Sequence, residues 1–247
     1  MDEPKERRIA ALEAELASVR TEMQQLVQTV SHDLRAPLRH IVSFARLVEE
    51  DAGEQLSPEV LGFLSTITDS ANHLGALLDG LLVLSRAGTA PLQLEPTPTL
   101  PLVKEVCAAL AQQHAQRSID WQLPSVLPDV WADGVLLRQA LNHVLGNAVK
   151  FTTPRAHAVI AVSLLGGEGA NTVLEIADNG VGYNPAHQDK LFRVFGRLHG
   201  PRDFEGVGVG LVTTRKLLQR MGGMVDCESG PSGGCRVVIR LPSVPFH

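Results

Sequence analysis

The apolar residues near the start of the chain follow a seven-residue repeat. They are spaced alternately three and four positions apart, which is the a/d pattern of a coiled coil. The set is Ile9, Leu12, Leu16, Val19, Met23, Leu26 and Val30. The next position of the pattern is Asp33, so the apolar seam ends beside His32. We therefore expect residues 1–30 to form a coiled-coil helix that leads into a polar site.

The helical period continues beyond this interruption. Residues 5–50 are predicted to form one long helix, softened at Pro37 because proline removes a backbone hydrogen bond. After a turn, Ser57-Pro58-Glu59 supplies an N-cap and a first-turn proline for a second apolar helix that ends near residue 88. A helical hairpin over 31–88 cannot cover its own apolar face. Pairing with a second copy into a dimeric four-helix bundle is the simplest solution.

The remainder of the chain mixes helical and strand periods. Four prolines between residues 89 and 101 indicate a linker and a domain boundary. In residues 102–247, strands interleave with helices and end in an antiparallel hairpin, which favours an α/β sandwich with one covered face. Helices are expected at 102–116, 136–149 and 210–221, and strands at 118–122, 129–133, 157–165, 172–177, 223–228 and 235–241. The fold class of the whole chain is therefore predicted to be α+β.

Composition narrows the class of protein. The chain has 247 residues, of which 44% are hydrophobic and 20% charged, and its net charge of −5 gives no basic field for nucleic acid. Three cysteines, without metal-ligand spacing, favour a reducing cytoplasmic setting. No apolar run reaches the roughly 20 residues that span a membrane, and the charged N-terminus lacks a signal-peptide core. We expect a cytoplasmic protein to which an upstream sensor module could have been joined.

The first candidate for chemistry in the second domain is a polar helix end. Asn147 lies among apolar residues, where an unpaired amide would cost stability. Its oxygen suits Mg²⁺, and Lys150, one turn further on, can meet phosphate as a point charge. A plain helix end with a polar cap explains the stretch equally well.

Two glycine-rich stretches follow. Asp178 ends a strand and precedes Gly180 and Gly182, so its carboxylate could accept a hydrogen bond from an amine such as that of adenine. The alternative is an ordinary Asp-Asn-Gly turn. The stretch from Gly206 to Leu211 runs into a helix, where backbone N–H groups attract phosphate. Its spacing fits neither the dinucleotide fingerprint nor a Walker loop.

The order of these motifs resembles that of the sensor histidine kinases of two-component systems, over nearly the whole chain. The sequences around His32 and around Phe195 are similar to those of kinases of the phytochrome-associated branch. In the family's terms, residues 32–38 resemble the phosphoacceptor box, 147–150 the N box, 178–182 and 206–211 the two glycine boxes, and 191–199 the F box.

The resemblance implies roles for individual residues. His32 would be the nucleophile that takes the γ-phosphoryl group of ATP, and Asp33 would orient its imidazole and assist as a base. Asn147 would hold Mg²⁺, and Arg197 would steady the γ-phosphate. The implied ATP site consists of Asn147, Lys150, Asp178, Gly180, Gly182, Arg197, Gly206, Gly208, Gly210 and Leu211.

The implied function is ATP-dependent autophosphorylation on His32 in a homodimer, followed by transfer to an aspartate of a response regulator, with the linker as a pivot. A chaperone-like ATPase that drives closure and a non-enzymatic dimeric scaffold are the alternatives. Two positions depart from the family pattern. His143 stands where a second asparagine is common, and we expect it to pack or contact phosphate. Ala36 stands where threonine or asparagine is common.

Overall fold

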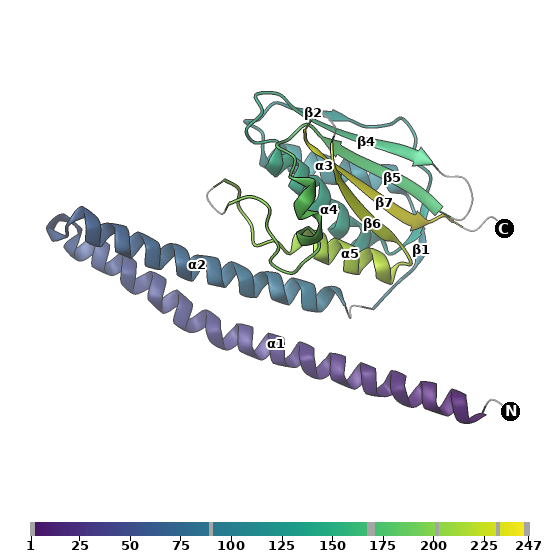
Figure 1. The fold of residues 1–247 in the computed structure, drawn as a ribbon, viewed down its shortest axis with the longest axis horizontal. Helices are drawn as coiled ribbons and strands as arrows, with labels where there is room; N and C mark the ends of the chain where they lie inside the picture. The colour runs from purple at the N-terminus through teal and green to yellow at the C-terminus, as the bar shows by residue number, and fades with distance from the viewer. Residues whose placement is uncertain (1–2, 89–90, 167–170, 201–202, 231–232, 245–247) are drawn as a thin grey trace. The chain divides into compact units, whose positions relative to one another are not determined.

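The computed structural model describes residues 3–88, 91–166, 171–200, 203–230 and 233–244. The chain divides into two compact units, Met1–Arg86 and Ala87–His247. Figure 1 shows the helical first unit and the sheet and helices of the second.

The first unit is a helical hairpin. Helix α1 (Glu3–Ala52) passes through Pro37 without interruption, as the predicted helix over 5–50 requires. A short 3₁₀ helix, η1 (Gly53–Gln55), then leads to α2 (Pro58–Ala87). Two contacts tie the helices together in antiparallel order: Arg35 Nη2 lies 2.5 Å from Asp79 Oδ1, and Gln24 Nε2 donates to Ser85 O at 3.4 Å.

The heptad residues of α1 do not face α2. All seven, from Ile9 to Val30, are 44–60% exposed in the single chain. The side chains of α1 that are buried, such as Val27 and Ser31, lie on another side of the helix. Because an apolar stripe of this length is unfavourable in water, the seam is a surface that needs a partner.

The second unit is built on a mixed five-stranded sheet with the order β2-β4-β5-β7-β6. Strand β2 runs parallel to β4, and the remaining neighbours are antiparallel. The strands are β2 (Ile119–Gln122), β4 (Ala158–Gly166), β5 (Asn171–Asp178), β6 (Met224–Ser229) and β7 (Cys235–Pro242). The helices are α3 (Thr99–Gln113), α4 (Gly134–Phe151) and α5 (Gly210–Arg220), with a 3₁₀ helix η2 (Pro185–Lys190).

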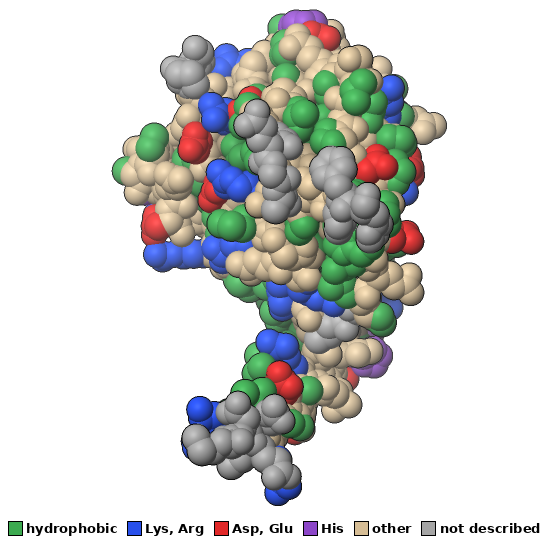
Figure 2. Space-filling view, turned by 90° about the vertical axis from the view of Figure 1, so that its right-hand side faces the viewer, with side chains coloured by type: hydrophobic (Ala, Val, Ile, Leu, Met, Phe, Trp, Pro, Cys, Tyr) green, Lys and Arg blue, Asp and Glu red, His purple; other side chains and the backbone are tan. Residues whose placement is uncertain are grey.

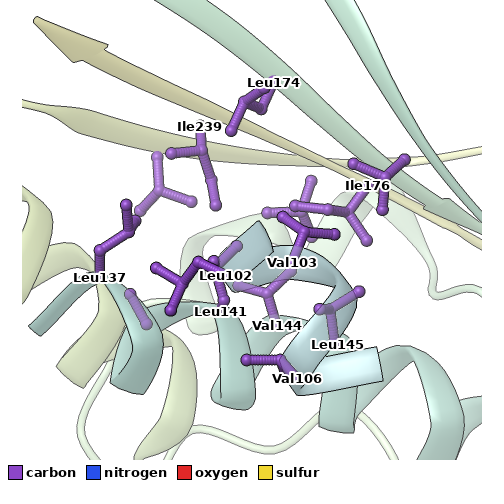
Figure 3. Close-up of a cluster of buried hydrophobic side chains, with 14 of the residues drawn as sticks. Leu102, Val103, Val106, Leu137, Leu141, Val144, Leu145, Leu174, Ile176 and Ile239 are labelled. Atoms are coloured by element: carbon purple, nitrogen blue, oxygen red, sulfur yellow. The ribbon is translucent and has the colours of Figure 1, made fainter. Parts of the chain in front are cut away.

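One face of the sheet packs on the helices. Alternate strand residues, such as Ile160, Leu174 and Ile239, are fully buried, as a half-covered sheet requires. Figure 3 shows Leu174, Ile176 and Ile239 of the sheet facing Leu137 and Leu141 of α4 and residues of α3. A helical N-terminal region followed by this mixed α/β sheet domain confirms the predicted fold class.

Most of the stretch 95–101 forms regular secondary structure, which corrects the prediction that residues 89–101 are a linker. Strand β1 (Glu95–Thr97) pairs antiparallel with β3 (Val130–Ala132), and α3 already begins at Thr99. Proline is tolerated in a short edge strand and in the first turn of a helix, where Pro101 lies, so the prolines mark a helix start instead of a linker. Residues 89–90 of the predicted linker lie outside the described residues.

The surface of the chain carries charges of both signs. On the face drawn in Figure 2, acidic and basic side chains are interspersed among apolar and neutral ones. This distribution accords with the modest net charge of −5.

Candidate functional site

Helix α4 carries the first group of candidate side chains. Asp133 caps its N-terminus by accepting from Val135 N and Leu136 N, which fixes where the helix begins. From there His143, Asn147 and Lys150 are spaced four and three residues apart and share one face. All three line a cavity of about 350 Å³ in the second unit.

Asp178 enters the same cavity from the end of β5. Its Oδ1 accepts backbone N–H groups from Gly180 at 2.8 Å and from Cys235 at 3.2 Å, which leaves Oδ2 as the atom available to a ligand. Burial raises the pKa of this carboxyl from 3.8 to about 6, against the two hydrogen bonds, which lower it. The carboxylate is therefore oriented by the backbone and poorly compensated for its lost hydration.

The two glycines after Asp178 serve different purposes. Gly182 lines the cavity and has φ = 65°, a conformation that favours glycine. Gly180 does not line the cavity. A Cβ at Gly180 would lie 2.6 Å from Phe151 O, so the absence of a side chain allows this turn to approach the end of α4. Gly180 therefore allows close packing of this turn, and its predicted contact with ATP stays a prediction.

The second glycine-rich stretch forms the opposite wall. Gly206 and Gly208 have φ values of 107° and 75°, and a Cβ at Gly208 would lie 2.4 Å from Gly196 O. Gly210 and Leu211 line the cavity where α5 begins. Among the described side chains none caps this helix end, so its first N–H groups and the positive end of its dipole are available to an anion.

Two basic residues lie near this wall. Burial and then the charge of Arg197 lower the pKa of Lys150, and Glu205 opposes the shift. The Arg197 guanidinium donates to three backbone carbonyls of one loop, those of Gly206, Phe204 (2.7 Å) and Gly200 (3.1 Å). Arg197 therefore holds the loop at the cavity mouth, and its predicted contact with the γ-phosphate stays a prediction.

His143 packs against the start of α5. A Cβ at Gly210 would lie 3.8 Å from the His143 side chain. Burial lowers the pKa of His143, and a hydrogen bond with the Gly210 backbone opposes this. Among the described residues, no partner accepts from or donates to its buried Nδ1. This half-buried imidazole packs on α5 and makes a poor ligand for a hard metal ion, and its other expected role, a contact with phosphate, stays a prediction.

Several lining residues were not singled out from the sequence. Phe151, His199 and Phe204 form a ring cluster with centroids 5.0–5.4 Å apart, and His199 Nε2 lies 2.9 Å from Gly182 O. Tyr183, Cys227 and Cys235 also line the cavity. These residues are distant in sequence and follow no shared spacing, so only the fold brings them together.

The candidate nucleophile lies in the first unit. The His32 side chain is 84% exposed and the Asp33 side chain 70% exposed, and His32 Nδ1 lies 3.1 Å from Asp33 Oδ1. This contact favours the tautomer that carries its proton on Nδ1, which leaves the lone pair on the solvent-facing Nε2. Ala36 lies one turn further along α1 and is half-buried.

The structure thus divides the predicted site residues into two sets. All the predicted ATP-site residues except Gly180 line one cavity. His32 and Asp33 lie together on a helix of the other unit. Among the described residues, no three His, Cys, Asp or Glu side chains gather as a metal site, and no helix is long and apolar enough to cross a membrane.

Comparison with known families matches both sets. Residues 22–90 match the His Kinase A (phospho-acceptor) domain, and residues 132–245 match the Histidine kinase-, DNA gyrase B-, and HSP90-like ATPase family. The two matches together cover most of the chain. His32 lies inside the first matched segment, and Asn147, Asp178 and the stretch 206–211 lie inside the second.

Individual relatives agree with these matches. Cyanobacterial phytochrome B from Nostoc sp. is 27% identical over 237 residues, covering 96% of this chain and 31% of that protein. Methanogenesis regulatory histidine kinase FilI from Methanothrix harundinacea is 32% identical over 236 residues, covering 96% of this chain and 26% of that protein. The chain therefore spans between about a quarter and a third of the length of these relatives.

A solved structure resembles the chain over most of its length. The crystal structure of full-length ShkA in complex with AMPPNP has 27% sequence identity and a TM-score of 0.62, covering 90% of this chain and 47% of that one. With a phospho-acceptor hairpin and an ATPase-type domain in this order, the chain belongs to the sensor histidine kinases.

Proposed function

We propose that the chain catalyses autophosphorylation of His32 by ATP and passes the phosphoryl group to an aspartate of a response regulator. The observation that carries this proposal is the convergence of Asn147, Lys150, Asp178 and the 206–211 stretch on one cavity. The same chain presents an exposed His-Asp pair on its helical hairpin. The ATP-binding family match and the AMPPNP complex of ShkA support ATP as the ligand.

The cavity offers complementary ends to a nucleotide. Asp178 Oδ2 would accept from the exocyclic amine of adenine, since Oδ1 is already occupied by two backbone donors. At the other end, Lys150 and the uncapped start of α5 would meet the phosphates.

Asn147 fits the requirement for Mg²⁺. Its amide oxygen is a hard donor, and Mg²⁺ commonly takes few protein ligands alongside phosphate oxygens and water. Bound there, the ion would supply charge neutralisation at the phosphates.

The His-Asp pair accounts for the chemical step. Nε2 of His32 attacks the γ-phosphorus, the new N–P bond forms as the bond from phosphorus to the β–γ bridging oxygen breaks, and ADP leaves. Positive charge develops on the imidazole, and Asp33, held at Nδ1, stabilises it and takes the proton. An exposed nucleophile suits a group that must meet two partners in turn, the nucleotide and the regulator's aspartate.

We further propose that the active form is a homodimer. The exposed heptad of α1 and the apolar face of the hairpin supply an uncovered surface on one chain. A second copy would cover both through a parallel coiled coil and a four-helix bundle. Because His32 and the cavity belong to different units, the boundary between these units near residue 87 would be the pivot that lets them meet.

A labelling experiment separates this function from its alternatives. With ATP labelled at the γ-phosphate, a histidine kinase incorporates label that is lost in acid and kept in alkali. An ATPase that drives closure releases labelled phosphate without labelled protein, and a scaffold does neither. Wild-type protein should become labelled, while His32→Ala should bind nucleotide but remain unlabelled. Substantial labelling of His32→Ala, or acid-stable label, would overturn the proposal.

A further inference from the structure

Two cysteines meet in the wall of the cavity. Cys227 lies on β6 and Cys235 begins β7, and both line the same cavity as Asp178. Their Sγ atoms are 2.8 Å apart, and both thiols are free. This separation is only about 0.8 Å longer than a disulfide bond. The pair is therefore poised to form one with little movement.

The strand register shows which movement is needed. Cys227 is paired with Val237 and Cys235 with Ser229, so the two cysteines are diagonal neighbours on one face of the sheet. The Cα atoms of a diagonal pair lie near the largest separation that a disulfide can bridge, so closing the bond requires a small backbone shift.

Cys235 is the member whose preceding backbone can adjust to make that shift. The carbonyl of Cys227 accepts from Tyr183 Oη at 2.9 Å and from Gln188 Nε2 at 3.2 Å, which holds the backbone of β6. Cys235 instead follows Gly233 and Gly234, whose φ values are 89° and 79°. Glycines adjust their dihedral angles more readily than any other residue.

A shift of Cys235 would reach Asp178 directly. The backbone N–H of Cys235 donates to Asp178 Oδ1 at 3.2 Å. Gly234 packs so closely that a Cβ there would lie 1.9 Å from Asp178 O. Any displacement at the start of β7 therefore alters the orientation of this carboxylate.

We propose that Cys227 and Cys235 form a modification site, in which a peroxide oxidises the pair to a disulfide that weakens nucleotide binding through Asp178. The second part rests on the proposed nucleotide site. With hydrogen peroxide, one thiolate attacks a peroxide oxygen, which gives a sulfenic acid and releases hydroxide that is protonated to water. The second thiol attacks the sulfenic sulfur, the S–S bond forms as the S–O bond breaks, and a second water leaves. Two thiols are oxidised and one peroxide is reduced.

The surroundings set the speed of this reaction. The hydrogen bond with Cys227 and then burial raise the pKa of the Cys235 thiol. The thiolate is the reactive form, so a raised pKa makes oxidation slow at neutral pH. The site is therefore expected to respond to sustained exposure to peroxide. The third cysteine, Cys107, lies in the core of α3, where burial raises its pKa to about 12, and it serves as an internal control.

The test treats the full chain with hydrogen peroxide, blocks remaining thiols with N-ethylmaleimide and maps the peptides by mass. The expected result is a peptide pair linked through Cys227 and Cys235, a loss of two hydrogen atoms from the intact chain, and no intermolecular crosslink on a non-reducing gel. Binding of a fluorescent ATP analogue should weaken at least roughly tenfold and recover with dithiothreitol, since a hydrogen bond to a charged group is disturbed.

Matched variants make the outcome specific. In Cys227→Ala and in Cys235→Ala, peroxide should leave the affinity of each variant for the analogue unchanged, whereas Cys107→Ala should respond as the wild type does. Absence of the linked peptide would overturn the modification site. Complete disulfide formation with unchanged affinity would overturn the coupling to Asp178. Because mapping needs no nucleotide, protein that forms the link but binds no analogue even when reduced would contradict the proposed function and support the modification site.

Discussion

The buried carboxylate of Asp178 is expected to favour ATP binding and to lower the stability of the fold. Replacing Asp178 by asparagine tests both effects. In Asp178→Asn the amide oxygen can still accept from Gly180 N and Cys235 N, so the local backbone is preserved. The amide nitrogen then occupies the place of Oδ2 and presents N–H donors to the adenine amine, which is also a donor. Two opposed donors with no acceptor should weaken ATP binding roughly a hundredfold.

The same change should stabilise the fold. Burial raises the pKa of Asp178 from 3.8 to about 6, so the folded protein binds more protons than the unfolded chain between these values. The stability of the wild type therefore falls as pH rises through this window, and an amide does not titrate. Above pH 7 this pKa shift lowers the free energy of unfolding of the wild type by about 2–3 kcal/mol. The lower value allows for solvent in the cavity.

Urea denaturation followed by tryptophan fluorescence measures this effect, because Trp121 and Trp131 both lie in the second unit. The advantage of Asp178→Asn in free energy of unfolding should be small near pH 4 and complete above about pH 7. Asp226→Asn, which removes an exposed carboxylate of β6, should show no such gain. An Asp178→Asn protein that binds ATP normally, or is less stable than the wild type at pH 8, would contradict these expectations.

Three further predictions follow from other residues. Gly208→Ala should lower the free energy of unfolding by roughly 1–3 kcal/mol, because its φ is positive and Gly196 O fills the space for a Cβ, whereas Gly210→Ala should be mild; equal urea midpoints would contradict this. Ala36→Thr or Ala36→Asn should speed dephosphorylation of a phospho-regulator. The reason is that alanine offers no hydrogen bond to the hydrolytic water and Arg35 is engaged by Asp79. Fast dephosphorylation by the wild type that neither substitution improves would contradict this. Insertion of single residues after Arg20 should change autophosphorylation with a period near seven, and a smooth decline with insertion length would indicate a plain dimer clamp.

Periodicity predicted the helices, and the glycine-rich motifs could be recognised as short runs of residues, because both depend on neighbours in sequence. The heptad of α1 and the glycine stretches 178–182 and 206–211 required only local spacing. The linker prediction failed at 95–101 because β1 is defined by its pairing with β3, a contact across more than thirty residues. Prolines alone do not distinguish a linker from an edge strand followed by a helix start.

Contacts between side chains of the cavity wall could not be predicted from local spacing either. The ring cluster of Phe151, His199 and Phe204 joins α4 to a loop about fifty residues later, and no spacing in the sequence indicates it. The raised pKa of Asp178 depends on burial that arises only in the folded protein. Arg197 could be placed at the site from its motif, but its three carbonyl partners emerge only from the folded loop.

His32 should be phosphorylated on the imidazole nitrogen that Asp33 leaves free. After incubation with ATP and Mg²⁺, the protein should be denatured in alkali and examined by phosphorus NMR, with peptide mapping to assign the residue. We expect one phosphoramidate, at Nε2 of His32, because Nδ1 lies 3.1 Å from Asp33 Oδ1. Phosphate on Nδ1, on another residue, or on no residue at all would contradict it.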